Sequence, residues 1–202
     1  MRLASILLGL VAAASWSLPA AAHEVVYEAN LSGGAVSPPS GSLGTGFVRI
    51  TIDLDVLTMR VQASFSGLTG ATTAAHIHCC LVQGGPANVV AATQIPAPAS
   101  FPLGVTAGAY DQTLDISVAS SYNPQFVTDH GTLGDALDAM LNGLSGGTAY
   151  FDVHTSASAG GEIRGNLRSA PTVESLPFGF AVALAVALPV AAALRARARA
   201  VP

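Results

Sequence analysis

The chain has 202 residues, only 10% of them charged, and it contains no lysine, so all eight basic residues are arginines. Between residues 23 and 170 there are four arginines and eleven acidic residues, a net charge of −7 with histidine neutral. This balance excludes nucleic acid as a partner, because nucleic-acid binding depends on basic side chains that neutralise phosphates. A stretch of this length is sufficient for one domain with its own core.

Residues 1–22 are typical of a secretory signal peptide. Arg2 precedes an apolar run from Leu3 to Ala14, and Ala20-Ala21-Ala22 offers small residues for cleavage. The alternative is an uncleaved anchor, but the apolar run is short for a membrane span. We therefore predict that residues 23–170 form a domain exported to the periplasm, the cell surface or the extracellular space.

The first half of the domain has the alternation of β-strands. We predict a strand over residues 24–31, followed after a loop by a hairpin whose arms cover residues 48–54 and 59–65. Each arm alternates apolar and polar residues, which gives one face to the core and one to solvent. Such a pattern favours an antiparallel sheet that is covered on one side.

The next strand carries most of the unusual chemistry. Ala75-His76-Ile77-His78-Cys79-Cys80 alternates, so His76, His78 and Cys80 are predicted to share one face. A loop-rich stretch follows over residues 83–109, with a short strand near residues 89–92. Another strand is predicted over residues 113–118, and a turn or irregular segment over residues 120–126.

One helix is predicted, over residues 133–142. Thr132 caps it with Asp135 as the partner three residues on, an apolar stripe follows the helical period, and Gly143 is expected to close it in a left-handed conformation. After the helix, Tyr150, Asp152 and His154 share one face of a further strand, and residues 162–167 form a return strand.

These elements predict a mostly β fold. We expect an antiparallel Greek-key β-sandwich, immunoglobulin-like or superoxide-dismutase-like, with one short helix near residues 133–142.

If the two histidine-bearing strands are neighbours, their polar faces form one histidine-rich patch. His76 and His78 then make a two-point chelate suited to zinc or copper, and His154 adds a third nitrogen. Asp152 or Glu162 is expected to add an oxygen or to orient a ring from outside. The alternatives are hydrogen-bonded structural histidines, or a ligand site without metal.

Glu162 and Arg164 lie two residues apart on one strand, so an ion pair with each other or with a neighbouring strand is expected. Such pairs are usually structural. We find no nucleophile elbow, phosphate-binding loop or paired-carboxylate arrangement, and no residue is assigned a catalytic role.

Cys79 and Cys80 are the only cysteines. In an oxidising compartment they can form a vicinal disulfide, remain thiols, bind metal through Cys80 or pair between chains. The vicinal disulfide is the preferred prediction. It closes no long loop, so it should add little stability through chain entropy.

Residues 171–202 have a different character from the domain. Leu176–Leu194 is an apolar stretch of about membrane-spanning length, and Arg195, Arg197 and Arg199 follow it. Arginines after the last apolar stretch place that end in the cytoplasm and the domain outside. The segment is either a permanent anchor or a sorting signal removed by a membrane transpeptidase.

Three short motifs together resemble the CHRD (chordin-like) domain family. They are Ala75–His78, Val153–Thr155 and Gly161–Gly165, with the helix between the first two, and the resemblance covers about residues 24–168. Many members continue His-Ile-His with Gly-Pro, where this chain has Cys79-Cys80. The tail resembles a PEP-CTERM sorting signal, although its short motif lacks the usual Pro-Glu-Pro.

The resemblance implies an extracellular β-sandwich module without an established enzymatic activity. We therefore predict a non-catalytic binding or structural module of the cell envelope, with exopolysaccharide, a surface protein or another copy of itself as partner. The alternative prediction is a copper- or zinc-binding β-sandwich that uses His76, His78 and His154.

Overall fold

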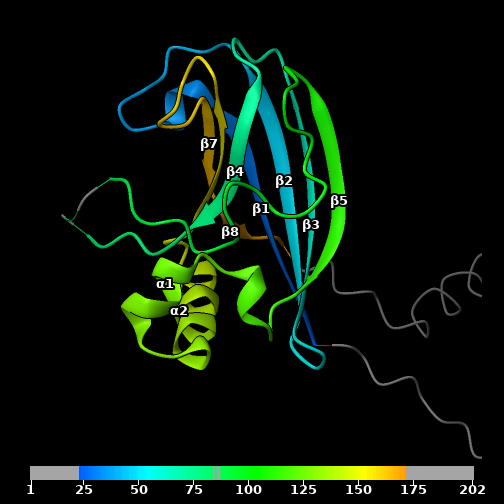
Figure 1. The fold of residues 1–202 in the computed structure, drawn as a ribbon, viewed down its shortest axis with the longest axis vertical. Helices are drawn as coiled ribbons and strands as arrows, with labels where there is room; N and C mark the ends of the chain where they lie inside the picture. The colour runs from blue at the N-terminus through cyan, green and yellow to red at the C-terminus, as the bar shows by residue number, and fades with distance from the viewer. Residues whose placement is uncertain (1–22, 84, 86, 172–202) are drawn as a thin grey trace, which may run out of the picture. The chain divides into compact units, whose positions relative to one another are not determined.

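The computed structural model describes residues 23–83, 85 and 87–171 (Figure 1). The segments predicted as signal peptide and as membrane tail lie outside these residues, apart from Pro171. Within the described part of the chain, no helix has both the length and the apolar character needed to cross a membrane. The described residues up to Ser169 form one compact unit.

Eight strands and two α-helices make up this unit. The strands are β1 (Glu24–Ser32), β2 (Thr45–Asp53), β3 (Thr58–Ser66), β4 (Thr72–His78), β5 (Gly108–Asp115), β6 (Tyr150–Thr155), β7 (Ile163–Asn166) and β8 (Arg168–Ser169). The helices are α1 (Pro124–His130) and α2 (Leu133–Ser145), with two 3₁₀ turns, Gly33–Ala35 and Ala119–Ser121.

The strands form one curled antiparallel sheet in the order β4-β6-β7-β1-β2-β3-β5, with β8 paired to β1. Figure 1 shows β4 and β7 on one side of the body and β2, β3 and β5 on the other, with both helices at one end. The predicted mostly β, antiparallel sandwich class is confirmed.

The core follows from the alternation of the strands. Val48, Ile50 and Ile52 of β2 are fully buried, and the exposed fraction of Phe151 and Val153 of β6 is at most 1%. Burying each such side chain contributes about 1.5–3 kcal/mol to the free energy of folding. The inward faces on the two sides of the curled sheet therefore stabilise the fold by packing against each other.

Helix α2 begins as predicted and ends later. The Thr132 hydroxyl accepts a hydrogen bond from the Asp135 N–H at 3.1 Å and donates to the Asp135 carboxylate at 2.6 Å. The predicted left-handed end at Gly143 is wrong, because the helix continues to Ser145. Gly143 has another role: a Cβ at this position would collide with the sulfur atoms of Cys79 and Cys80.

The prediction of a turn or irregular segment over residues 120–126 is corrected. Residues 124–130 form α1 rather than an irregular segment: Pro124 occupies the first helical position, and Asn123 caps the helix by accepting from the Gln125 N–H at 3.1 Å. The prediction of a single helix was therefore wrong.

The strand predicted over residues 113–118 is β5, which begins at Gly108 and ends at Asp115. All of it pairs in register with residues 58–65 of β3, and this pairing sets its bounds. Ile116 is still buried beyond the end of β5, which explains the longer apolar alternation. Of the strand predicted at residues 89–92, only an isolated bridge between His78 and Ala91 is present in the described region.

Candidate metal centre

Strands β4 and β6 are neighbours, as predicted. They pair antiparallel, with His76 opposite Asp152, His78 opposite Tyr150 and Ala74 opposite His154. Residues opposite each other in such a pair lie on the same face, so one face of the pair carries His76, His78, Tyr150, Asp152 and His154. Ala75, Ile77, Phe151 and Val153 lie on the other face and belong to the core.

Four side chains of this face converge, and we call them the His/Asp cluster: His76, His78, Asp152 and His154. The Oδ1 atom of Asp152 lies 3.0 Å from His154 Nε2, 3.2 Å from His78 Nε2 and 3.8 Å from His76 Nδ1. The His76 Nδ1 and His78 Nε2 atoms are 3.3 Å apart. One nitrogen or oxygen from each residue therefore faces a common point.

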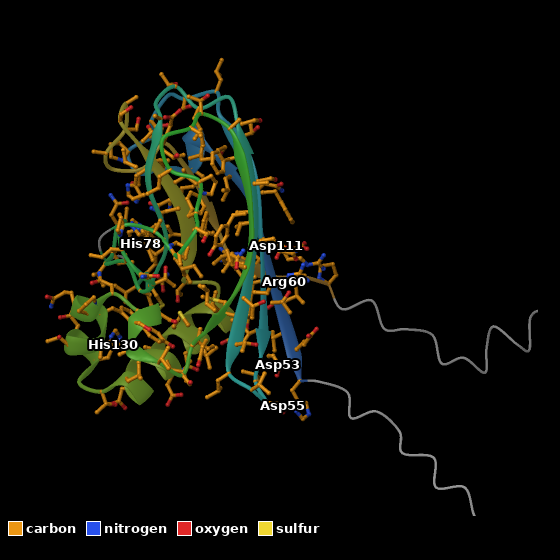
Figure 2. All side chains as sticks on the ribbon, turned by 45° about the vertical axis from the view of Figure 1, so that its right-hand side comes forward. Asp53, Asp55, Arg60, His78, Asp111 and His130 are labelled. Carbon is orange, nitrogen blue, oxygen red and sulfur yellow. A yellow bond between two sulfur atoms is a disulfide. The ribbon has the colours of Figure 1, made fainter. Side chains whose placement is uncertain are left out.

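The His/Asp cluster is shielded from solvent. Asp152 is 3% exposed and His76 8% exposed, and the side chains of His78 and His154 are only slightly more accessible. In Figure 2, His78 lies on the opposite side of the body from Arg60 and Asp111, which mark the outer face of β3 and β5. Burial of an ionisable cluster is costly unless its charges are compensated.

Backbone carbonyls fix the orientation of two of the imidazoles. His78 Nδ1 lies 2.6 Å from the Val89 carbonyl oxygen, and His154 Nδ1 lies 2.8 Å from that of Ala159. A carbonyl only accepts, so the proton sits on Nδ1 in both rings. In the neutral form of each ring, Nε2 then directs a lone pair at the cluster, which is the arrangement of metal-binding histidines.

Two atoms at the centre of the cluster lack hydrogen bonds. Asp152 Oδ1 and His154 Nε2 are buried and have no hydrogen-bond partner among the described residues, although they lie 3.0 Å apart. Buried polar atoms are normally satisfied, so an unsatisfied pair needs an explanation. A cation between them would satisfy both.

The surroundings also set the charges of the cluster. Burial acts to raise the pKa of Asp152, but the contacts with His154, His76 and His78 outweigh it and hold this pKa well below its usual range. Burial lowers the pKa of His76. For His154, burial acts to lower the pKa, while Asp152 and the Ala159 carbonyl together raise it. The ionised Asp152 carboxylate and the neutral His76 imidazole are forms that bind metal, whereas a charged His154 ring must lose a proton to bind it.

Glu162 lies outside the cluster, and its predicted place as an oxygen ligand or ring-orienting group is not what the structure shows. Its buried carboxylate accepts from the Ser42 hydroxyl at 2.6 Å, from the Thr155 hydroxyl, and from the backbone N–H groups of Thr69 and Gly70. Burial acts to raise its pKa, but these four donors lower it to about 2. Glu162 thus ties together three loops and β6.

Neither Glu162 nor Arg164 forms the predicted ion pair with any residue that the structure describes. Arg164 instead places its guanidinium carbon 3.3 Å from the centre of the Tyr150 ring. Its Nη1 atom donates to the Ala87 carbonyl at 2.9 Å and to Asn88 Oδ1 at 3.0 Å. The sequence analysis assigned Tyr150 no role, and its only signal was that it shares a strand face with Asp152 and His154.

The two cysteines are joined to each other by a disulfide directly after β4. Their sulfur atoms lie against α2, 3.6 Å and 3.3 Å from the Ala139 carbonyl oxygen. Cys80 therefore does not serve as a metal ligand of the His/Asp cluster, which was one of the alternatives for this residue, because its sulfur faces helix α2 and not the cluster.

The remaining two histidines lie elsewhere. His23 Nδ1 contacts Asp55 Oδ1 at 2.9 Å on the surface, and His130 Nδ1 lies 2.8 Å from the Phe126 carbonyl oxygen at the end of α1. Figure 2 shows His130 among the helices, apart from His78. These two residues are internal controls for any experiment on the cluster.

The fold and the site define a class of protein: an antiparallel β module with a buried cluster of three imidazoles and one carboxylate on neighbouring strands. The family model of the CHRD domain matches residues 27–167, and the chain belongs to this family. The whole His/Asp cluster, the disulfide and Arg164 lie within the match. No curated protein and no solved structure matches the chain.

Proposed function

We propose that this CHRD domain binds one zinc ion through the His/Asp cluster. The observation that carries the proposal is the convergence of His76 Nδ1, His78 Nε2, His154 Nε2 and Asp152 Oδ1 on one buried point. Three nitrogens and one oxygen are donors that zinc accepts in proteins.

The spacing of these atoms favours tetrahedral coordination. With zinc–nitrogen bonds of about 2.0–2.1 Å, neighbouring ligands of a tetrahedral site lie about 3.3–3.4 Å apart. Four of the six separations are 3.0, 3.2, 3.3 and 3.8 Å, which bracket that value, and all six are within 4.8 Å. Copper(II) prefers tetragonal geometry, and its occupancy is the alternative outcome of the test below.

Four protein ligands point to a structural metal rather than a catalytic one. Catalytic zinc sites keep one position open for water or substrate, whereas structural sites are filled by the protein. The His/Asp cluster is also buried. On this proposal the ion locks β4 to β6 and fixes the loops that supply the Val89 and Ala159 carbonyls.

We further propose that the module works outside the cytoplasm as a non-catalytic part of the cell envelope. Residues 1–22 and 176–194 support this with the sequence pattern of export and anchoring. The Cys79–Cys80 disulfide adds support, because such bonds persist in oxidising compartments. Exopolysaccharide or a surface protein remains the predicted partner.

Metal content tests the proposal. The protein is purified without chelator or nickel resin and measured by inductively coupled plasma mass spectrometry, both as isolated and after zinc and copper loading. We expect about one zinc per chain, lost in the His76→Ala/His78→Ala variant and retained in His130→Ala. A folded parent protein that holds neither metal after loading overturns the proposal.

A further inference from the structure

The His78 imidazole is braced by groups that are not part of the His/Asp cluster. Its Nδ1–H donates to the Val89 carbonyl at 2.6 Å. Val89 lies in the loop after β4, eleven residues further along the chain. Backbone hydrogen bonds from Cys79 to Val90 and from Ala92 to Ile77 hold the end of this loop against β4, but they do not involve Val89 itself. The orientation of His78 therefore also depends on what holds residues 87–89.

Tyr150 holds the loop from the strand next to His78. Its hydroxyl oxygen accepts a hydrogen bond from the Val89 N–H at 3.2 Å. Its ring also stacks on the His78 imidazole, with planes 4° apart and centroids separated by 4.7 Å. Tyr150 thus contacts both ends of the His78–Val89 hydrogen bond.

Arg164 completes the support from the far side of β6. β6 lies between β4 and β7, so the Tyr150 ring lies between His78 and the Arg164 guanidinium. From there Nη1 reaches Ala87 and Asn88, the two residues that precede Val89. These contacts form a closed circuit. It runs from His78 to Val89, through the loop to the Arg164 guanidinium, and back to His78 through the stacked Tyr150 ring.

We infer that Arg164 and Tyr150 are positioning residues of the metal centre, which set the Nδ1–H form and the ring orientation of His78 through the Val89 carbonyl. The inference rests on the proposed zinc site. Neither residue belongs to the His/Asp cluster. Outer partners of this kind typically change metal affinity by about 10–100-fold when removed.

The shape of the guanidinium matters as well as its charge. A planar guanidinium stacks on an aromatic face and donates to two acceptors at once, which a lysine ammonium cannot do. Arg164 is also buried, and its Nε atom has no partner among the described residues. The stacking on Tyr150 and the two contacts with the loop offset this cost.

Zinc affinity of the full-length protein, measured by competition with a chromophoric chelator, tests the inference together with long-range ¹H–¹⁵N spectra that report the tautomer of His78. We expect Arg164→Ala to bind zinc about 10–100-fold more weakly. Arg164→Lys should fail to restore affinity. In both variants the zinc-free protein should lose the pure Nδ1–H signature of His78.

Two further variants keep the test decisive. Tyr150→Phe retains the stack and removes only the hydroxyl contact with Val89, so it reports on the circuit even where an Arg164 variant does not fold. Arg60→Ala, which breaks an exposed pair with Asp111 at 2.6 Å on the opposite side of the body, is the matched control. It should bind zinc as the parent does.

The outcomes separate this inference from the proposed function. A parent protein without zinc affinity overturns the proposed function and the inference with it. A parent that binds zinc, together with folded Arg164→Ala or Tyr150→Phe that keep parent affinity and the Nδ1–H form of His78, overturns the inference alone. Weaker binding with a changed His78 tautomer supports it.

Discussion

Asp152 Oδ1 approaches His154 Nε2 to 3.0 Å, and yet the two atoms are not aligned for a hydrogen bond and have no other hydrogen-bond partner among the described residues. In the neutral His154 ring the proton is on Nδ1, where the Ala159 carbonyl accepts it, so Nε2 presents a lone pair to a carboxylate. Two acceptors held together in a buried site repel each other. A cation between them turns this repulsion into attraction.

Removal of the central charge should abolish tight metal binding. Asp152→Asn keeps the shape of the side chain but replaces the anionic donor by a neutral amide. We expect zinc affinity to fall by more than about 100-fold, beyond the loss typical of outer partners. Chelator competition measures it, with Asp111→Asn on the exposed face as control. An Asp152→Asn protein with parent affinity contradicts this assignment.

Zinc should stabilise the folded domain through its binding free energy. At a free zinc concentration 100 times the Kd, the free energy of unfolding rises by about 2.7 kcal/mol. For about 150 residues this corresponds to a rise in Tm of roughly 5–10 °C. Differential scanning calorimetry should show this shift in His130→Ala and none in His76→Ala. An equal shift in His76→Ala is the contrary result.

The Glu162 carboxylate should make stability fall in acid. Its pKa is about 2 in the folded protein against 4.5 for an ordinary glutamate, so the charged form stabilises the fold. That stabilisation is complete above pH 4.5 and is lost as the pH falls towards 2. The shift is equivalent to roughly 3 kcal/mol.

Glu162→Gln should therefore be less stable than the parent at neutral pH, and the difference should shrink between pH 4.5 and 2. Denaturant unfolding at a series of pH values measures it, with Glu24→Gln at the exposed start of β1 as control. A difference between parent and Glu162→Gln that stays constant from pH 7 to pH 2 contradicts the assignment.

Two glycines of α2 should respond oppositely to alanine. At Gly134 the nearest atom to an added Cβ is Thr132 Oγ1 at 3.8 Å, so Gly134→Ala should stabilise by up to about 1 kcal/mol through helix propensity. At Gly143 the added Cβ collides with the Cys79 and Cys80 sulfurs, so Gly143→Ala should destabilise by about 1–3 kcal/mol.

The disulfide itself can be tested as the cause by a double-mutant cycle. Replacing Cys79 and Cys80 by alanine removes the atoms that exclude the methyl group. We expect Gly143→Ala to cost less in that background than in the parent. Equal costs in the two backgrounds, measured by denaturant unfolding, contradict a role for the sulfurs.

The strand period alone was enough to predict the main part of the site. His76 and His78 lie two apart on β4, and Asp152 and His154 lie two apart on β6, so each pair shares one face of its strand. Because the two strands are neighbours, the two pairs then meet on a common face. The resemblance to CHRD domains in the same segments agreed with this. Local alternation also predicted the β2–β3 hairpin, because its turn is short and its partner is adjacent in sequence.

Contacts made by loops could not be predicted in this way. The Val89 and Ala159 carbonyls orient His78 and His154, but no sequence pattern marks which backbone carbonyl a loop will present. The partners of Glu162 come from separate segments up to 120 residues away. Arg164 was expected to pair with a carboxylate. Its stacking on Tyr150 could not be predicted, because it depends on the order of three strands in the sheet.

Helix α1 was missed although its start was visible. Asn123 before Pro124 is a typical helix start, but seven residues are too few to show a helical apolar period. Gly143 was misread as a helix end for a related reason, since a glycine required by a close contact has the same sequence signal as one required by a turn.

The coordination shell of the bound metal tests the central claim most directly. X-ray absorption spectroscopy at the zinc edge, on protein loaded with one equivalent, reports ligand number, type and distance. We predict four nitrogen or oxygen neighbours at about 2.0–2.1 Å with the multiple-scattering signature of three imidazoles. A sulfur shell near 2.3 Å, or a shell of oxygens with at most one imidazole, would place the metal elsewhere and contradict the account.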